Sequence, residues 1–359
     1  MTEQRPLVSI IIDTYYRPAL LREAVEALQN QTYDRIEIVI VNNAATPETV
    51  AYLHELQTRE PRVRLVHFTQ NQFSWDDPQM MVRTCYNAGL RASRGELIFH
   101  QADDDWVAPD FFERMVRLFV ENERCTTAIG LPVSAYPDGS FKSYKQDNKR
   151  PRYMPGHELA LAVLGRNGGY ANPGFCFVMR RNALERAGGF HEALDIQLMF
   201  GVVPFGVTGF DPKALMYWRR HELQLNKLMT SRGHAASGYA VKLLAETDIE
   251  PRWREAFGEH ECQRVVDHIL DYEFVGAADV FVLNLFDLRF QAAARALRFG
   301  WKHRRFRRAV PSKLWAYGRL FPLKMLRILL RRMGLYGSAR KLKLWLSSRK
   351  DGSQRKEFP

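Results

Sequence analysis

The sequence has few cysteines and no long apolar run. Its four cysteines stand far apart among 359 residues, without a Cys-x-x-Cys pair, which argues against a zinc site and favours a reducing compartment. No stretch approaches the roughly 18–20 uninterrupted apolar residues of a membrane-spanning helix. The first apolar patch is short and ends at Asp13, which is unlike a signal peptide. We therefore expect a cytoplasmic protein, and a hydrophobic fraction of 46% is sufficient for a large core.

Acidic residues are missing from one segment near the end of the chain. Residues 301–350 contain 16 Lys or Arg and no Asp or Glu, whereas all other residues hold 36 basic against 40 acidic side chains. The net charge of +12 is therefore a property of this segment, and the body of the protein is slightly acidic. The length is typical of two domains, or of one large domain with an extension.

The first hundred residues alternate between short β-branched runs and helical patterns. The patterns predict strands over residues 8–12, 36–41, 63–68 and 96–100, and helices that start at Pro18, at Pro47 and near residue 79. Helical crossovers of this length are typical of a parallel sheet. The sequence therefore predicts an α/β fold.

Polar residues follow three of these predicted strands. The clusters are Asp13–Tyr16, Asn42 with Asn43, and the triplet Asp103–Asp105. Because ligands of open α/β sheets bind at the carboxyl ends of the strands, we expect the three clusters to converge on a single site.

Three adjacent aspartates repel one another and suit a hard divalent cation. Mg²⁺ and Mn²⁺ prefer oxygen ligands, and Mg²⁺ typically binds one or two carboxylates together with substrate phosphates. The pattern therefore predicts a metal ion and a nucleotide diphosphate. The structural alternative is that Asp105 caps a helix starting near Pro109, which would explain one aspartate of the three.

Four segments in order resemble one enzyme family. They are VSIIIDTYYRPALLREAVEALQNQTYDRIEIVIVNNAAT, RTCYNAGLRASRGELIFHQADDDWVAPDFFE, AGGFHEALDIQL and YWRRHELQLNKL. Together they resemble the inverting, GT-A-fold glycosyltransferases of family 2, over roughly the first 220 residues. The resemblance implies a GT-A-like, Rossmann-related, mostly parallel mixed sheet with flanking helices. It places the catalytic domain at 1–225, with a nucleotide-sugar half (1–105) and an acceptor half (106–225).

The resemblance also implies roles for individual residues. Asp103 would face the donor ribose, and Asp104 would bind Mn²⁺ or Mg²⁺, with Asp105 and His221 completing the metal set. Thr14, Tyr16, Asn42 and Arg83 would also bind the donor, and Asn87 would lie near its diphosphate. In the family's frequent Asp-x-Asp-Asp motif, Ala102 stands at the first position, so the roles within the triplet stay open.

Three residues depart from the family pattern near the nucleotide. Asp13 stands where the family usually has Pro, Tyr16 where it has Asn, and Asn42 where it has an Asp that accepts a hydrogen bond from the uracil ring. An asparagine carbonyl can accept that bond, but without charge. A UDP, dTDP or GDP donor therefore stays open.

An inverting transfer needs a general base that removes the proton of the acceptor hydroxyl. Asp195 in the segment GGFHEALDIQL resembles the Asp of the family's Glu-Asp-x-x-Leu signature, with Leu194 in place of Glu. The resemblance therefore implies that Asp195 is the base, with Glu192 as the nearby rival.

The remaining chain is predicted to be helical. Residues 226–300 form a helical extension without recognisable chemistry, and residues 351–359 a disordered tail. Within 301–350, a helical wheel places Leu323, Leu326, Leu330 and Met333 opposite Lys324, Arg327 and Arg331. Basic and apolar faces with interspersed tryptophans are typical of helices that lie on an anionic membrane.

We therefore expect a peripheral protein on the inner face of the cytoplasmic membrane, and no nucleic-acid partner. A helix packed on the body with solvated Lys and Arg is the simpler alternative for the segment. The predicted function is metal-dependent sugar transfer from a nucleotide-sugar donor to a glycan or lipid-linked acceptor. The alternatives are a nucleotidyltransferase, which the absence of glycine from DTYYRP disfavours, and a non-catalytic sugar-nucleotide or glycan-binding protein.

Overall fold

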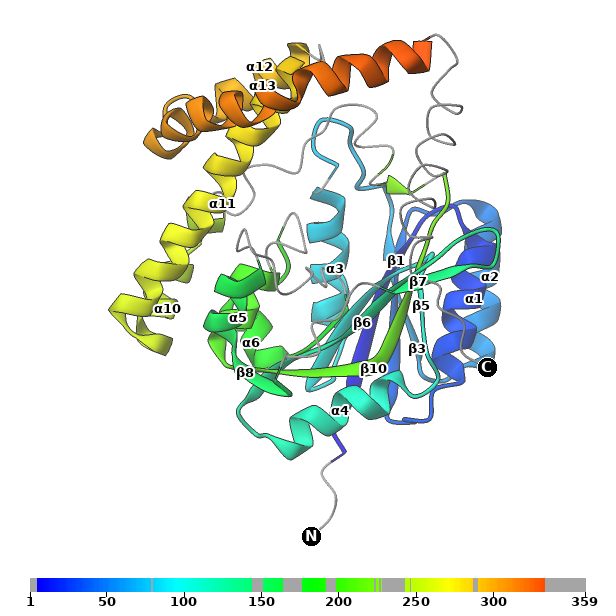
Figure 1. The fold of residues 1–359 in the computed structure, drawn as a ribbon. Coiled ribbons are helices and arrows are strands. Elements are labelled where there is room, and N and C mark those ends of the chain that lie inside the picture. The colour runs from blue at the N-terminus through cyan, green and yellow to red at the C-terminus, as the bar shows by residue number, and fades with distance from the viewer. Residues whose placement is uncertain are drawn as a thin grey trace, which may run out of the picture. The chain divides into compact units, whose positions relative to one another are not determined.

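The computed structural model describes most of the chain (Figure 1). The described residues are 5–78, 80–143, 151–163, 176–191, 198–222, 224–225, 227, 243–245, 247–286 and 290–332. By its contacts the chain divides into two compact units, Met1–Glu273 and Phe274–Pro359. The predicted domain boundaries at residues 225 and 300 stay predictions.

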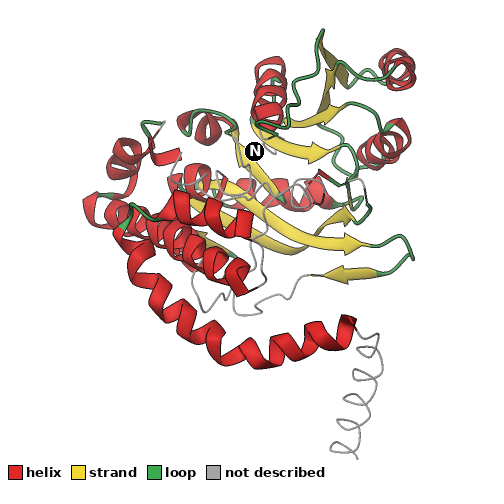
Figure 2. Cartoon of the chain, turned by 90° about the horizontal axis from the view of Figure 1, so that it is seen from above, coloured by secondary structure: helices red, strands yellow, loops and turns green. Residues whose placement is uncertain are grey.

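The first unit is built on a mixed ten-stranded sheet (Figure 2). Its main order is β3-β2-β1-β4-β9-β6-β10-β5, with β7 on β6 and β8 on β10. The strands are β1 (Val8–Thr14), β2 (Ile36–Asn43), β3 (Val63–Phe68), β4 (Leu97–Ala102), β5 (Trp106–Val107), β6 (Cys125–Ala135), β7 (Phe141–Ser143), β8 (Tyr153–Pro155), β9 (Phe177–Arg180) and β10 (Val207–Arg219). Strands β1–β4 pair in parallel, and so do β6 and β10.

The four predicted strands are confirmed, and three of them extend further than predicted at the carboxyl end. Their last polar residues still pair in the ladder, since Thr14 lies opposite Asn42 and Asp13 lies opposite Ala102. The clusters after β1 and β2 therefore begin inside the sheet, whereas the aspartate triplet starts directly after Ala102, the last residue of β4.

Helices cover both faces of this sheet. The helices α1 (Pro18–Gln29), α2 (Pro47–Arg59) and α4 (Phe111–Glu121) share a core with the side chains of Ile10 and Ile12. The helices α3 (Met80–Ala92), α5 (Gly156–Val163) and α6 (Arg181–Arg186) share a second core with Ile11. Because successive side chains of a strand point to opposite faces, the all-apolar run in β1 supplies both cores, as expected for a sheet covered on two sides.

The second core also receives helical elements from the later part of the first unit. They are the short turns η1 (Leu198–Val202) and η2 (Val203–Phe205), α10 (Ile249–Phe257) and the start of α11 (Glu259–Phe286). Trp253 of α10 is fully buried there. The described part of 226–300 is thus helical, as predicted.

The second unit consists of the end of α11, α12 (Phe290–Gly300) and α13 (Arg304–Arg332). The ring of Phe274 stacks on His303 at 3.7 Å between centroids, and Lys313 forms an ion pair with Asp279. Among the described helices, none is both long and apolar enough to span a bilayer.

Candidate functional site

Three strand ends bring the predicted polar clusters to one edge of the sheet. Strand β1 lies between β2 and β4 and runs parallel to both. Thr14, Asn42 and Asp103 therefore follow one another across three neighbouring carboxyl ends. The predicted convergence on a single edge is confirmed for these elements.

The three aspartates after β4 are buried together with few counter-charges. Asp103, Asp104 and Asp105 are only 2%, 7% and 5% exposed. The guanidinium of Arg17 forms ion pairs with both Asp103 and Asp104, and the Thr14 hydroxyl donates to Asp103 Oδ2 at 2.8 Å. We call these three aspartates, with Arg17 and His221, the aspartate corner.

Burial changes the protonation of this corner. It raises the pKa of Asp103 to about 7 even though Arg17 opposes the shift, and burial together with the neighbouring Asp104 raises the pKa of Asp105 well above its usual range. Burial also raises the pKa of Asp13, against a hydrogen bond from Tyr86. The corner therefore holds more carboxylate than its cations neutralise, and it favours a further cation or proton.

Asp105 is fixed by a distant part of the chain. The backbone N–H of Arg219, at the end of β10, donates to its Oδ1 at 3.0 Å, and Gln101 Nε2 donates to its carbonyl oxygen at 3.0 Å. Helix α4 begins at Phe111 with Asp110 at the N-cap position. The alternative that Asp105 caps this helix is therefore wrong, because its carboxylate is engaged by β10.

A metal ion would find two side-chain ligands here. His221 Nε2 lies 2.9 Å from Asp104 Oδ2, while Asp105 is held by Arg219. Among the described residues, no three His, Cys, Asp or Glu side chains are arranged to hold a metal ion. The predicted set of Asp104, Asp105 and His221 thus does not close around one point, and the contact of Asp104 with His221 is the part that the structure brings together.

The end of β2 forms the neighbouring part of the edge. Asn42 Oδ1 accepts the N–H of Ala45 at 2.7 Å, and its Nδ2 lies 3.1 Å from His67 Nδ1. Tyr16 is 42% exposed, and Arg17 lies over its ring at 5.8 Å. The loop after β1 thus presents an aromatic ring to solvent beside the aspartate corner.

Helix α3 carries two residues that were expected near the donor, Arg83 and Asn87. Arg83 lies in the first turn of the helix, which follows the carboxyl end of β3. Asn87 makes two hydrogen bonds to the backbone of Phe190, donating to the carbonyl at 2.7 Å and accepting the N–H at 2.9 Å. Because its amide is used in this way, Asn87 positions the turn at Gly188–Phe190 and does not extend toward a diphosphate.

That turn leads toward the predicted base. Gly188 and Gly189 have φ angles of 88° and 82°, and a Cβ on Gly189 would lie 2.5 Å from Asn87 Oδ1, so both positions favour glycine. The two glycines thus form the turn that follows α6. Asp195 and Glu192 lie outside the described residues.

Sequence reasoning missed Arg17 and Arg219. Arg17 forms ion pairs with Asp103 and Asp104, and Arg219 contacts Asp105 and the carbonyl oxygen of Asp104. Neither role follows from the spacing of residues in the sequence, since Arg17 follows β1 and Arg219 ends β10. A cluster of three buried acids needs cations nearby, so the arginine in DTYYRP was the available signal. Arg180, at the end of β9, is used within the fold, because its guanidinium donates to the carbonyls of Cys125 and Phe119.

Comparison with known proteins gives one family match. The sequence profile described as "Glycosyl transferase family 2" matches residues 9–188, which is half of the chain.

Two curated relatives are similar over shorter stretches. The putative glycosyltransferase EpsH of Bacillus subtilis is 32% identical over 114 residues, 32% of this chain and 30% of that protein. The chondroitin synthase of Pasteurella multocida is 27% identical over 136 residues, 38% of this chain and 13% of that protein. The aligned stretches thus span less than a third of either relative.

A solved structure resembles the whole fold. The crystal structure of S. aureus TarS 1-349 in complex with UDP-GlcNAc covers 98% of this chain and 93% of that one, with a TM-score of 0.58 at 15% identity. The similarity confirms the predicted GT-A-like fold, including the helices after the sheet.

Proposed function

The chain belongs to glycosyl transferase family 2, and from this we propose that it transfers a sugar from a nucleotide-diphosphate donor to an acceptor hydroxyl with inversion. The observation that carries the proposal is the aspartate corner, in which buried carboxylates lie at the carboxyl edge of a parallel sheet with too little positive charge. A cation bound to a diphosphate supplies the missing charge.

In this proposal the donor lies across the ends of β1, β2 and β4. Asp103 accepts hydrogen bonds from the ribose. Asn42 lies next to the base, and its amide oxygen, which already accepts the Ala45 N–H, accepts one further hydrogen bond from the base through its second lone pair. The exposed ring of Tyr16 stacks on the base or sugar, with Thr14 keeping Asp103 oriented. Arg83, in the first turn of α3, faces the diphosphate, where a cation is favourable. UDP, dTDP and GDP donors all fit this arrangement.

The side chains of Asp104 and His221 fit Mn²⁺ or Mg²⁺ as its two protein ligands. The Asp104 carboxylate and the His221 imidazole lie side by side, and substrate phosphates provide the other oxygens that such a cation requires. When bound, the metal would offset the charge that develops on the leaving diphosphate. Arg17, which now pairs with Asp103 and Asp104, would keep these carboxylates neutralised before the donor arrives.

We assign Asp195 as the general base. It would accept the proton of the acceptor hydroxyl as that oxygen attacks the anomeric carbon, opposite the leaving diphosphate. Asn87 supports this assignment, since it fixes the backbone at Phe190, five residues before Asp195 along the chain.

We also propose that the second unit contacts an anionic membrane and brings the enzyme to a glycan or lipid-linked acceptor. Trp301 and Trp315 are 57% and 63% exposed, and Arg319 lies 3.6 Å from the centroid of the Trp315 ring. Exposed tryptophans beside basic residues are typical of surfaces that bind a membrane interface. Deleting residues 301–359 should release the protein from anionic liposomes, and continued sedimentation with them would contradict this role.

A donor panel tests the proposed activity. UDP-, dTDP- and GDP-sugars are compared by thermal shift and by slow donor hydrolysis, each with and without Mn²⁺. We expect one nucleotide class to raise the melting temperature in a metal-dependent way. If none does, while the protein is folded, the proposed function fails.

A further inference from the structure

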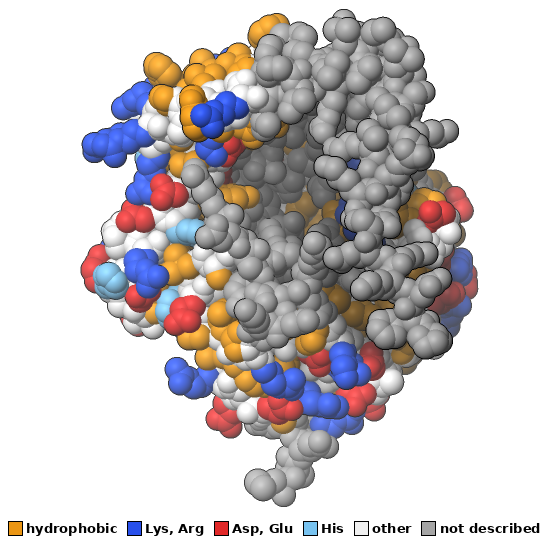
Figure 3. All heavy atoms as spheres, viewed as in Figure 1, with side chains coloured by type: hydrophobic (Ala, Val, Ile, Leu, Met, Phe, Trp, Pro, Cys, Tyr) orange, Lys and Arg blue, Asp and Glu red, His pale blue; other side chains and the backbone are white. Residues whose placement is uncertain are grey.

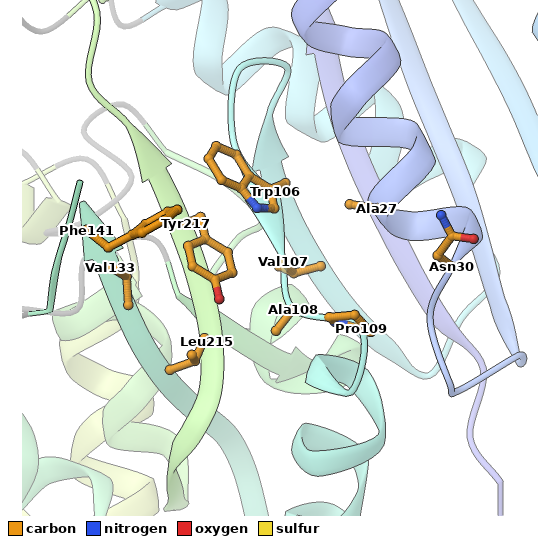
Figure 4. A pocket seen from close by; sticks show the side chains of 10 residues that line it. All are labelled: Ala27, Asn30, Trp106, Val107, Ala108, Pro109, Val133, Phe141, Leu215 and Tyr217. Atoms are coloured by element: carbon orange, nitrogen blue, oxygen red, sulfur yellow. The ribbon is translucent and has the colours of Figure 1, made fainter. Parts of the chain in front are cut away.

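A pocket lies beside the aspartate corner in the first unit, and none of its described lining residues is charged (Figure 4). Its volume of about 630 Å³ is typical of ligand-binding pockets. The lining comes from α1, the β5–α4 junction, β6, β7 and β10, and includes Ala27, Asn30, Trp106, Phe141, Leu215 and Tyr217. We call this pocket the aromatic groove.

Three rings form one wall of the aromatic groove. Trp106 and Tyr217 are stacked with centroids 5.1 Å apart and an angle of 12°, and Phe141 meets Tyr217 edge-on at 5.6 Å. Phe141 is 62% exposed on the short strand β7. Trp106 and Tyr217 are half-buried beside it, and an aromatic cluster that opens to solvent in this way indicates a binding site.

The wall is joined to the aspartate corner through Arg219. The guanidinium carbon of Arg219 lies 4.5 Å from the centroid of the Trp106 ring, and its Nε donates to the carbonyl oxygen of Asp104 at 2.9 Å. Trp106 itself directly follows Asp105. The aromatic groove therefore begins next to the atoms that we propose to bind the donor.

Hydrogen bonds already join the elements that line the aromatic groove. Gln31 Nε2 donates to the carbonyls of Ala27 at 3.0 Å and Ala108 at 2.8 Å, and the N–H of Ala108 donates to the Leu215 carbonyl at 2.9 Å. These bonds tie α1 and β10 to the segment after β5. A ligand would therefore meet a surface that needs little rearrangement.

We propose that the aromatic groove binds neutral sugar units of the acceptor glycan, next to the unit that is glycosylated. This proposal rests on the proposed function. Uncharged lining argues against phosphates and nucleotides. One face of a pyranose ring carries C–H bonds with partial positive charge, which pack on the negative face of an aromatic ring.

The polar groups in the aromatic groove favour a sugar over a lipid tail. The Asn30 amide, the Trp106 indole N–H and the Tyr217 hydroxyl contribute hydrogen-bonding groups to the lining. Sugar hydroxyls can pair with such groups, whereas a hydrocarbon chain would bury them unpaired at a cost.

The test measures oligosaccharide binding to the full chain by saturation-transfer NMR and calorimetry, with chitohexaose, cellohexaose and maltohexaose as probes and farnesol as the lipid probe. Ala27→Trp fills the aromatic groove from α1, and Glu26→Trp places the same ring on the exposed side of that helix as the matched control. We expect at least one hexasaccharide to bind, A27W to abolish binding, and E26W to leave it unchanged.

A second variant covers the case in which A27W does not fold. Phe141→Ala removes the exposed ring from an edge strand, and we expect about three- to tenfold weaker binding. Binding of no hexasaccharide, equal binding by all variants, or A27W-sensitive binding of farnesol alone would overturn the proposal. The donor-induced thermal shift, measured on the same proteins, reports separately on the proposed function.

Discussion

The aspartate corner and the aromatic groove are joined by Arg219, which contacts Asp104 of the corner and Trp106 of the groove, and they differ in how they would bind a ligand. The corner buries three carboxylates with a single guanidinium bridging two of them, so it gains from any added cation. The described lining residues of the aromatic groove are uncharged, and the hydrogen bonds of Gln31 join α1 to the segment after β5. On the face shown in Figure 3, acidic and basic side chains are interspersed over the described surface.

This difference indicates how the two sites would select their ligands. Under the two proposals, electrostatic selection at the corner would require a charged donor and would depend on pH and metal. Selection in the aromatic groove would depend on shape and on aromatic contact, and would be insensitive to salt. A variant that changes one site without the other would separate donor binding from acceptor binding.

The largest effect is expected at the proposed base, which neither site contains. Asp195→Asn should lower turnover by about 10²- to 10⁴-fold, because the acceptor proton loses its carboxylate, while the donor-induced thermal shift is kept. Glu192→Gln is the matched control and should retain most of the turnover. Single-turnover kinetics measure both variants. Undiminished turnover in D195N, or an equal loss in E192Q, would remove Asp195 as base.

The next effect concerns the charge balance of the corner. Arg17→Gln leaves Asp103 and Asp104 without their guanidinium, and breaking a buried ion pair on one side costs about 3–5 kcal/mol. We expect a matching drop in the free energy of unfolding, partly recovered by Mn²⁺, since the metal replaces the lost charge. Chemical denaturation with and without Mn²⁺ measures it.

An exposed arginine provides the control for this prediction. Arg59 pairs with Glu55 at 3.5 Å on the surface of α2, so Arg59→Gln should cost less than about 1 kcal/mol. If R17Q and R59Q lower the free energy of unfolding by the same amount, Arg17 does not neutralise an excess of carboxylate charge in the aspartate corner.

The contrast between the sites also explains what the sequence could and could not predict. The strands, the three polar clusters and the family resemblance follow from local patterns, since β-branched runs and their carboxyl-end residues are contiguous in sequence. Arg219 and Tyr217 reach Asp105 and Trp106 only because β10 pairs antiparallel with β5. That pairing joins residues over a hundred positions apart, and no spacing rule encodes it.

His100 shows that the environment of a buried polar side chain is equally hard to predict from the sequence. His100 is 4% exposed, and neither of its ring nitrogens has a hydrogen-bond partner among the described residues. The centroid of its ring lies 5.5 Å from that of Tyr86 and 5.8 Å from that of Phe190. Burial lowers its pKa to about 3. In sequence it is simply a polar residue within a strand.

His100 should make the protein acid-sensitive. A histidine whose pKa is depressed on folding contributes stability that is present above its unfolded pKa of about 6.5 and is lost as the pH falls toward 3. His100→Phe keeps an aromatic ring and removes two unpaired nitrogens, so we expect it to stabilise the protein by about 1–3 kcal/mol at pH 5.

The pH dependence separates this explanation from simple repacking. The free energy of unfolding of H100F should fall less steeply between pH 6.5 and pH 4 than that of the wild type. His260, which is exposed on α11, provides the control, and His260→Phe should leave the slope unchanged. If the free energy of unfolding has the same pH dependence in H100F and in the wild type, burial of His100 is not the cause of the acid sensitivity.

The smallest effect is expected in the loop that joins β2 to α2, where the corner's edge turns away from the sheet. Ala44 has a φ of 51°, and an L-residue in this left-handed region costs about 1–2 kcal/mol. Ala44→Gly removes that cost but adds backbone entropy to the unfolded chain, so a net gain of about 0.5–1 kcal/mol is expected. Ala45, whose φ is not positive, is the matched control, and Ala45→Gly should lower the free energy of unfolding by about the same amount. Thermal denaturation compares the two, and a loss of stability in A44G would show that the loop relaxes its conformation at no cost.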